Sequence, residues 1–171
     1  MIRADAAAVL ITGAYGTGKT SVVEEIADLL EARHVRYGAI DLDWLGWFDS
    51  GSSDHEAGRP VMLKNLEAVI GNYYASGVRR FAVSGAMAST EQVDELRAVI
   101  SMPLTVVRLT APIEEIEKRL GQSPTAGRQH DLAVAREWLT SHRSADIGDL
   151  VIANDAGLHE VATRIVAVLG W

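Results

Sequence analysis

The sequence predicts an α/β fold in which helices cover both faces of a parallel sheet. Short apolar runs of strand length alternate along the chain with longer segments of helical periodicity. A chain that returns through a helix after each strand builds parallel strands joined by right-handed crossovers. The first run, 7–12 (AAVLIT), is apolar almost throughout, which is typical of a strand buried on both faces. The length of 171 residues and the ordinary composition favour a single domain over residues 1–171.

Each element is predicted from its own pattern. A Gly-rich loop follows the first strand, and a helix is expected from residue 20 because apolar residues between Val22 and Leu30 recur at helical spacing. Further strands are predicted at 37–41, 81–84, 104–109 and 151–153, and further helices at 61–75, 90–100, 113–120, 132–139 and 158–169. Two segments interrupt the alternation, 44–59 and 121–130. Because both are rich in small and polar residues, we expect functional loops there.

The composition excludes several classes of site and partner. Without cysteine the chain forms neither disulfides nor thiolate metal sites, which fits the cytoplasm. The net charge of -7 argues against nucleic acid, because its phosphates are bound by clustered Lys and Arg. The N-terminal apolar stretch is far shorter than a membrane span and carries no targeting pattern. We therefore expect a cytoplasmic monomer or homodimer whose partner is a small molecule, not nucleic acid or a membrane.

Residues 13–20 (GAYGTGKT) match the phosphate-binding pattern G-x-x-x-x-G-K-[ST] between a predicted strand and a predicted helix. The glycines let backbone N–H groups converge on phosphate oxygens, and the helix N-terminus adds partial positive charge. Lys19 is expected to reach the terminal phosphates and Thr20 to offer its hydroxyl to Mg²⁺. The motif therefore predicts that ATP and Mg²⁺ bind here. The expected nucleotide contacts in this segment are Gly13, Ala14, Tyr15, Gly16, Thr17, Gly18, Lys19, Thr20 and Ser21.

Asp41 and Asp43 lie at the carboxyl end of the second predicted strand, the edge at which open parallel sheets bind ligands. Carboxylates there can orient Mg²⁺ and accept the proton of an attacking hydroxyl. The alternative is that Asp41 ends the strand and caps the next helix while Asp43 is solvated. A switch GTPase is a further possibility, because residues 43–46 (DWLG) have the pattern D-x-x-G. The chain lacks the N-K-x-D that recognises guanine, which weighs against this possibility.

Two arginines are candidates for a lid over the phosphate loop, because phosphoryl transfer depends on neutralising the charge of the moving group. Arg119 closes a predicted helix, and Arg128 lies in the flexible insertion. Pairing of Arg119 with Glu115 along the helix is the alternative. The lid is expected in region 119–131.

The acceptor is expected to bind in region 42–60, which mixes aromatic and polar residues. Trp47 and Arg59 are its candidate contacts there, although tryptophans on so short a stretch can equally be core residues. Ser84 and Gly85 follow the third strand and supply a hydroxyl and a backbone that a ligand can approach closely.

With these positions in place, the chain resembles the small P-loop kinases, the nucleoside monophosphate kinase-like group that includes shikimate, gluconate and adenylylsulfate kinases and the antibiotic phosphotransferases. The resemblance implies a three-layer P-loop NTPase fold with strand order 2-3-1-4-5 and a short lid. It implies that Asp41 and Asp43 bind acceptor or metal, and that Arg119 and Arg128 are base-stacking and lid arginines. By the same resemblance, Asn154 lies in the loop that touches adenine.

The expected function is transfer of the γ-phosphoryl group of ATP, with Mg²⁺, to a hydroxyl or phosphate of a small molecule. The segment DWLGWF stands where related kinases carry arginines that grip the acceptor, and Arg59, Arg79 or Arg80 can take that role. If one of them faces the pocket, a nucleoside monophosphate kinase is favoured. A nucleotide-binding regulatory ATPase or GTPase-like switch is the alternative from another class. The expected catalytic residues are Lys19, Asp41, Asp43, Arg119 and Arg128, and the expected metal ligands are Thr20 and Asp41.

Overall fold

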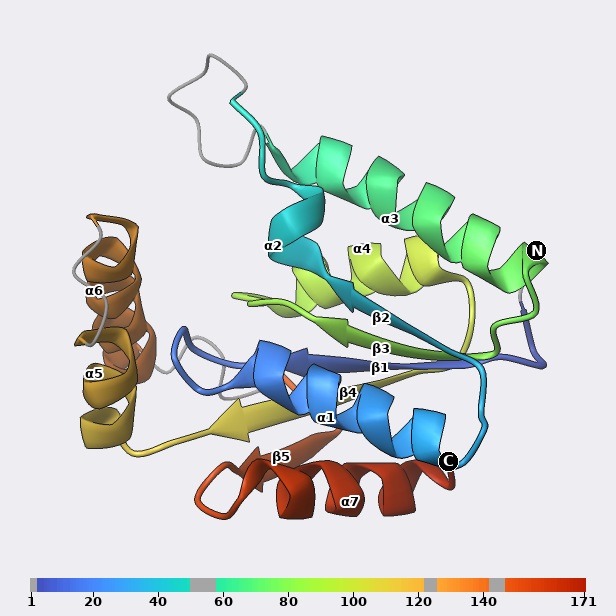
Figure 1. The fold of residues 1–171 in the computed structure, drawn as a ribbon. Helices are drawn as coiled ribbons and strands as arrows, with labels where there is room; N and C mark the ends of the chain where they lie inside the picture. The colour runs from blue at the N-terminus through green and yellow to red at the C-terminus, as the bar shows by residue number, and fades with distance from the viewer. Residues whose placement is uncertain (1–2, 50–57, 122–125, 142–146) are drawn as a thin grey trace.

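The computed structural model describes residues 3–49, 58–121, 126–141 and 147–171, with the side chains of 126–130 and 140–141 left undescribed. Five strands form one parallel sheet in the order β2-β3-β1-β4-β5, so the predicted fold class and strand order are confirmed (Figure 1). The strands are β1 (Ala7–Thr12), β2 (Tyr37–Asp41), β3 (Arg80–Ser84), β4 (Leu104–Thr110) and β5 (Leu150–Ala153).

Helices cover both faces of this sheet, as the buried pattern of β1 requires. Successive side chains of a strand point to opposite faces, and Leu10 packs in one core cluster whereas Val9 and Ile11 pack in another. The first core is closed by α3 (Arg59–Ala75) and α4 (Thr90–Ile100), and the second by α1 (Lys19–Ala32) and α7 (Leu158–Leu169).

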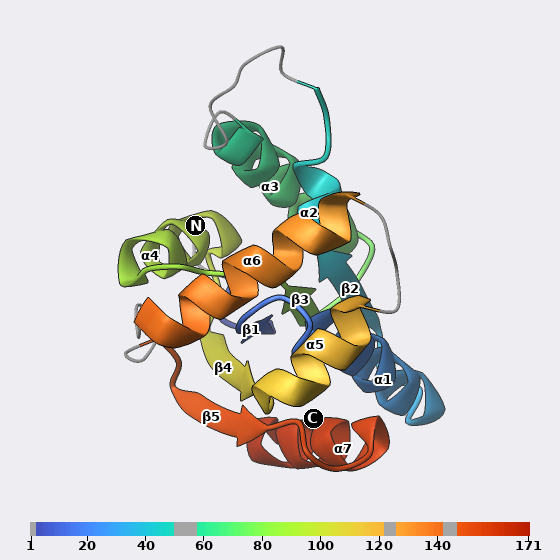
Figure 2. The same cartoon turned by 90° about the vertical axis from the view of Figure 1, so that its left-hand side faces the viewer.

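Three further helices surround the carboxyl ends of the strands, where the phosphate loop lies. They are α2 (Leu42–Leu45), α5 (Ile113–Gly121) and α6 (Ala126–Ser141). Figure 2 looks onto this edge and shows α5 and α6 lying in front of the sheet. A small third core joins Ala14 of the phosphate loop to these two helices, with Ile116 and Leu120 from α5 and Ala135 from α6. The phosphate loop is therefore packed against α5 and α6.

The structure corrects the sequence prediction in region 121–130. Helix α6 begins at Ala126, six residues before the predicted start, so Arg128 lies in a helix and not in a flexible insertion. The first turn contains Gly127 and polar residues, and the apolar periodicity that predicts a helix begins only at Leu132. No helix in the described part of the chain is long and apolar enough to cross a membrane.

Candidate functional site

The phosphate loop joins β1 to α1 and depends on glycine at positions where a side chain has no room. Gly13 and Gly18 have φ values of 136° and 94°, which favour glycine. A Cβ on Gly18 would lie 2.6 Å from Nδ2 of Asn154, and one on Gly13 would collide with the carbonyl oxygen of Leu109. The loop therefore runs close to β4 and to the end of β5, and it presents the N-terminus of α1 to the space outside, where an anion is favoured.

Side chains from two distant elements hold the carbonyl groups of this loop. The buried amide of Asn154 donates a hydrogen bond to the Thr17 oxygen at 2.7 Å. Arg119 on α5 donates to the carbonyl oxygens of Gly16 and Thr17 at 3.2 and 3.3 Å. Asn154, which was expected to lie beside adenine, therefore supports the phosphate loop. An asparagine directly after the last strand was enough to place Asn154 in the site from the sequence. The sequence did not show that its partner is the Thr17 carbonyl group.

Lys19 lies in the centre of the site with its side chain buried. Its Nζ donates to the carbonyl oxygen of Ala14 at 3.1 Å and lies 5.0 Å from the centroid of the Tyr15 ring. Burial lowers the pKa of Lys19, and the nearby carboxylates Asp43, Asp41 and Asp131 act in the opposite direction. The ammonium group therefore contacts a loop carbonyl oxygen, while the nearby carboxylates favour its charged form.

Asp41 connects β2 to α1 through the predicted metal ligand Thr20. The Thr20 hydroxyl donates to Oδ2 of Asp41 at 2.8 Å, and the backbone N–H of Asp43 donates to Oδ1 at 2.9 Å. The second bond caps α2 at its N-terminus. Asp41 thus caps α2, as the alternative interpretation predicted, and also faces the phosphate loop. A hydroxyl and a carboxylate oxygen are ligands that suit Mg²⁺.

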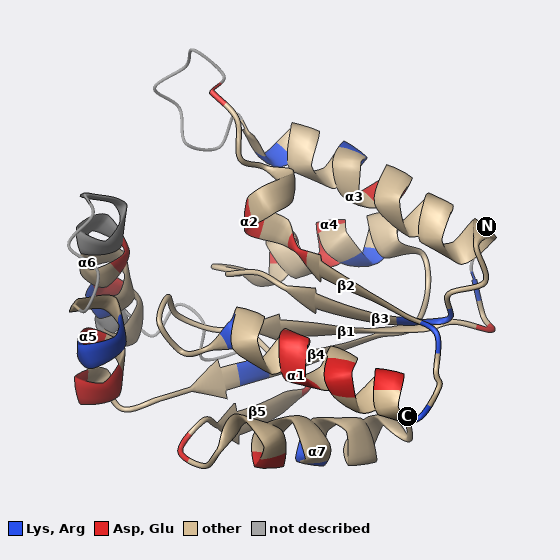
Figure 3. Ribbon diagram, viewed as in Figure 1, with Lys and Arg blue, Asp and Glu red and all other residues tan. Residues whose placement is uncertain are grey.

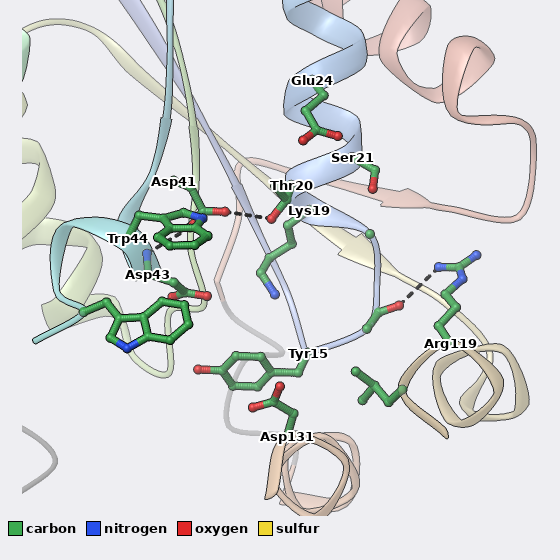
Figure 4. A pocket seen from close by; sticks show the side chains of 14 residues that line it. Tyr15, Lys19, Thr20, Ser21, Glu24, Asp41, Asp43, Trp44, Arg119 and Asp131 are labelled. Carbon is green, nitrogen blue, oxygen red and sulfur yellow. Dashed lines mark hydrogen bonds between the residues drawn. The ribbon is translucent and has the colours of Figure 1, made fainter. Parts of the chain in front are cut away.

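Asp43 lies in α2 and faces the same pocket (Figure 4). Desolvation of the carboxyl group inside the pocket raises its pKa although the residue as a whole is exposed, the charges of Asp41 and Asp131 raise it further, and Lys19 lowers it. A carboxylate whose pKa is raised is a stronger base, which suits proton transfer from a hydroxyl near neutral pH.

The pocket has a volume of about 850 Å³ and brings together residues from the phosphate loop and from all three helices at the carboxyl edge. Trp44 of α2 and Trp47, which follows this helix, are exposed: 69% of Trp44 and 74% of Trp47 is accessible to solvent. They are therefore not core residues. Their ring centroids lie 4.9 Å apart. The lining residues are Tyr15, Gly16, Gly18, Lys19, Thr20, Ser21, Glu24, Asp41, Asp43, Trp44, Trp47, Arg119, Leu120 and Asp131.

Two acidic residues of this lining, Glu24 and Asp131, were not identified from the sequence. Asp131 comes from α6, and Figure 4 shows it beside Tyr15. Because α6 reaches the phosphate loop only through tertiary packing, no local pattern marks this residue. Glu24 lies one turn beyond Thr20 on α1, a spacing that places both on one face of the helix. This spacing from Thr20 could have identified Glu24 from the sequence.

Three expected acceptor contacts are not among the residues that line the pocket. Arg59 pairs with Glu95 at 2.7 Å and donates to the Gln92 carbonyl oxygen at 3.1 Å, which ties α3 to α4. Ser84 is buried, and its hydroxyl has no hydrogen-bond partner among the described residues. Gly85 packs against Leu42 so closely that a Cβ would lie 2.6 Å from its side chain.

Two other candidate arginines, Arg79 and Arg80, also lie away from the pocket. Arg79 binds Asp5 at 2.7 Å, and the Arg80 guanidinium lies 5.9 Å from the Trp171 ring centroid. Both residues stand at the amino end of β3, the edge opposite the phosphate loop. The side chain of Arg128 lies outside the described residues.

Comparison by sequence finds no matching family model and no matching curated protein. Comparison by structure finds kinases of small molecules over nearly the whole chain. The adenylylsulfate (APS) kinase of Mycobacterium tuberculosis, in complex with AMPPNP and APS, is 19% identical with a TM-score of 0.68 and covers 98% of this chain and 99% of its own.

Two further solved structures extend this likeness to other kinases. A gluconokinase from Sinorhizobium meliloti is 22% identical with a TM-score of 0.62 and covers 98% of this chain and 94% of its own. A shikimate kinase from Acinetobacter baumannii, in complex with shikimate, is 19% identical with a TM-score of 0.60 and covers 95% and 92%. The chain therefore has the fold of the P-loop small-molecule kinases.

Proposed function

We propose that the protein is an ATP- and Mg²⁺-dependent phosphotransferase that moves the γ-phosphoryl group of ATP to a hydroxyl group of a small molecule. One observation carries the proposal. A phosphate loop with its buried lysine, a Thr20–Asp41 pair suited to Mg²⁺ and a second carboxylate, Asp43, line one pocket. Phosphoryl transfer requires the positioning of these groups more than covalent chemistry by the protein.

Each residue of this set has a distinct role in the proposed reaction. The loop N–H groups and Lys19 hold the phosphates of ATP, and Arg119 adds positive charge beside the loop. Mg²⁺, held by Thr20 with Asp41, would neutralise charge on the phosphate oxygens. Asp43 orients the acceptor hydroxyl and accepts its proton, which its raised pKa favours.

A hydroxyl acceptor is supported over a nucleoside monophosphate by the positions of the arginines. A nucleoside monophosphate kinase needs cations that grip the phosphate of the acceptor. Arg59, Arg79 and Arg80 were the residues expected to supply them, and each has structural partners outside the pocket. Among the described lining residues, the Lys and Arg side chains are Lys19 and Arg119, and both contact the phosphate loop.

The test is release of ADP from MgATP in the presence of pooled acceptors: nucleosides, nucleoside monophosphates, sugar acids, polyols, amino alcohols and amino sugars. We expect a hydroxyl-bearing pool to raise ADP release well above hydrolysis by water. Lys19→Ala should reduce the stimulated rate by about a hundredfold or more, because it removes the charge at the transferred group. Lys64→Ala, an exposed lysine of α3, is the matched control and should match the wild type.

Circular dichroism of Lys19→Ala would show that the fold is retained. Stimulated activity that persists in this folded variant would exclude the phosphate-loop mechanism. Nucleotide binding without stimulation by any pool would favour the regulatory ATPase alternative.

A further inference from the structure

The cations of the pocket lie on one side of it, and this asymmetry bears on the acceptor in the proposed function, on which this inference rests. The phosphate side carries Lys19 and Arg119, together with the acids Asp41 and Glu24. The other side carries the carboxylates of Asp43 and Asp131 and the indole rings of Trp44 and Trp47. Figure 3 shows acidic residues on α2 and α6, and also on α1, α5 and other helices.

The cations of the pocket are committed to the phosphate side. Lys19 Nζ lies 3.1 Å from the Ala14 carbonyl oxygen, and Arg119 lies 3.2 Å from that of Gly16. Both side chains therefore lie where the proposed function places the phosphates of ATP. No other Lys or Arg of the described chain lines the pocket. An anionic acceptor would enter beside several carboxylates without a described cation to pair with it, which costs free energy.

The proposed Mg²⁺ site uses Thr20 with Asp41 and leaves the carboxylates of Asp43 and Asp131 for other ligands. Asp41 is bound by Thr20 and by the N–H of Asp43. Asp131 arrives from α6 beside Tyr15, and no described side chain donates a hydrogen bond to it. Its negative charge acts on Lys19 and Asp43 and would also attract a positive group of a ligand in the pocket.

The tryptophan pair favours the same kind of ligand by a different force. The Trp44 and Trp47 rings lie 4.9 Å apart with an angle of 33° between their planes, and both are mostly exposed. The face of an indole ring attracts cations, and aromatic side chains bind quaternary ammonium ligands in this way. Exposed aromatic rings that line a pocket also bind the apolar body of a small molecule.

We propose that the acceptor is a hydroxyl compound with a positive charge, of the class of amino alcohols, amino sugars or quaternary ammonium alcohols, whose cation faces Asp131 and the Trp44–Trp47 pair while its hydroxyl lies at Asp43. The hydroxyl oxygen attacks the γ-phosphorus of ATP and forms the new P–O bond. The bond from the γ-phosphorus to the bridging oxygen breaks, and ADP leaves with that electron pair. The hydroxyl proton passes to the Asp43 carboxylate.

The test uses acceptor probes of different charge. Choline is compared with 3,3-dimethyl-1-butanol, its neutral isostere, and glucosamine with N-acetylglucosamine, while gluconate is the anionic probe. We expect at least one cationic probe to raise ADP release from MgATP with a kcat/KM about tenfold or more above its neutral counterpart. Gluconate should be the poorest acceptor. A preference for a neutral or anionic probe would overturn the inference and leave the phosphotransferase function standing.

A variant series tests the assigned contact. Asp131→Asn should raise the KM of the best cationic probe about tenfold, while the KM of its neutral counterpart and of MgATP stay within about twofold. Asp28→Asn, an exposed acid of α1 outside the pocket, is the matched control and should leave all three constants unchanged.

Asp131→Lys should weaken the cationic probe further and improve gluconate. Equal loss of the cationic and neutral probes in Asp131→Asn would assign the residue a structural role and overturn the inference. Failure of every probe and every acceptor pool to raise ADP release would instead overturn the phosphotransferase function on which the inference rests.

Discussion

At the scale of single residues, the site gains precision because its acidic side chains also build the local backbone. Asp41 closes α2 with one carboxylate oxygen and binds Thr20 with the other. The position of Asp43 follows, because its N–H is one partner of that cap. A carboxylate that is fixed by backbone contacts pays little entropy when ligands bind, which is how a small site maintains its geometry.

The raised pKa of Asp43 predicts the pH dependence of activity. Asp43 must be ionised to accept a proton, so activity should fall on the acid side at a higher pH than an ordinary aspartate would give. The negative charge of Asp131 is one cause of the raised pKa. Asp131→Asn should therefore lower the pKa of Asp43 and shift the acid limb of kcat/KM to lower pH.

The measurement is a pH profile of wild type and variant with the same MgATP and a neutral acceptor, so that ionisation of the nucleotide affects both alike. Asp28→Asn should reproduce the wild-type limb. If the acid limb stays in place or moves to higher pH in Asp131→Asn, the charge of Asp131 does not raise the pKa of Asp43.

At the scale of elements, α5 supports the phosphate loop from the side opposite to β1. A Cβ on Gly16 would lie 3.0 Å from both Ile116 and Leu120, so the loop backbone rests directly on these side chains. Both are buried. The same helix carries Arg119, whose guanidinium binds two loop carbonyls. Packing and hydrogen bonding from one helix therefore set the conformation that receives the phosphates.

This arrangement predicts that Leu120→Ala affects both stability and nucleotide binding. Removing a buried leucine costs about 2–5 kcal/mol of unfolding free energy, and here the cavity would lie under Gly16. The KM for MgATP should rise several-fold. Leu96→Ala on α4 is the matched control, because Leu96 is fully buried in the core cluster away from the loop.

Urea denaturation and steady-state kinetics check the two effects separately. Leu96→Ala should lose similar stability with an unchanged KM for MgATP. If the two variants show the same KM, α5 does not support the loop in the manner that its contacts indicate.

Most elements were predictable because their signals are local. The strands are apolar runs, α4 and α7 have the predicted bounds, and the phosphate loop is a contiguous motif with fixed chemistry. Helix α2 was missed because four residues are too few to show periodicity, although Asp41 was recognised as a possible cap. Asp131 was missed because its role depends on where α6 packs, and the partners of Arg59 depend on the contact between α3 and α4.

At the scale of the whole molecule, the carboxyl and amino ends of the strands form two edges of the sheet that have different roles. The carboxyl edge holds the phosphate loop, the acids and the pocket. The amino edge holds a cluster that joins the start of the chain to α3: Arg79 binds Asp5, Tyr74 donates to Asp5 at 2.7 Å, and the Arg79 guanidinium lies 4.0 Å from the Tyr74 ring centroid. In Figure 3, β3 begins with basic residues at this edge, away from α5 and α6.

The division between edges predicts that Arg79→Ala destabilises the protein without altering its chemistry. The variant loses the ion pair with Asp5, the ring contact and hydrogen bonds to the carbonyl oxygens of Tyr74 and Val78. Because this side chain is partly exposed, we expect a loss of about 1–3 kcal/mol in unfolding free energy. The kinetic constants for acceptor and MgATP should stay within about twofold, since the residue lies at the edge opposite the pocket.

Urea denaturation with kinetics below the unfolding transition checks this prediction, with Lys64→Ala as the control for loss of a surface cation. A large rise in acceptor KM with unchanged stability would place Arg79 on the substrate. A nucleoside monophosphate would then regain support as the acceptor, because a guanidinium that grips a phosphate is the feature that such an enzyme requires. A loss confined to stability keeps phosphate recognition at the carboxyl edge, where Lys19 and Arg119 lie.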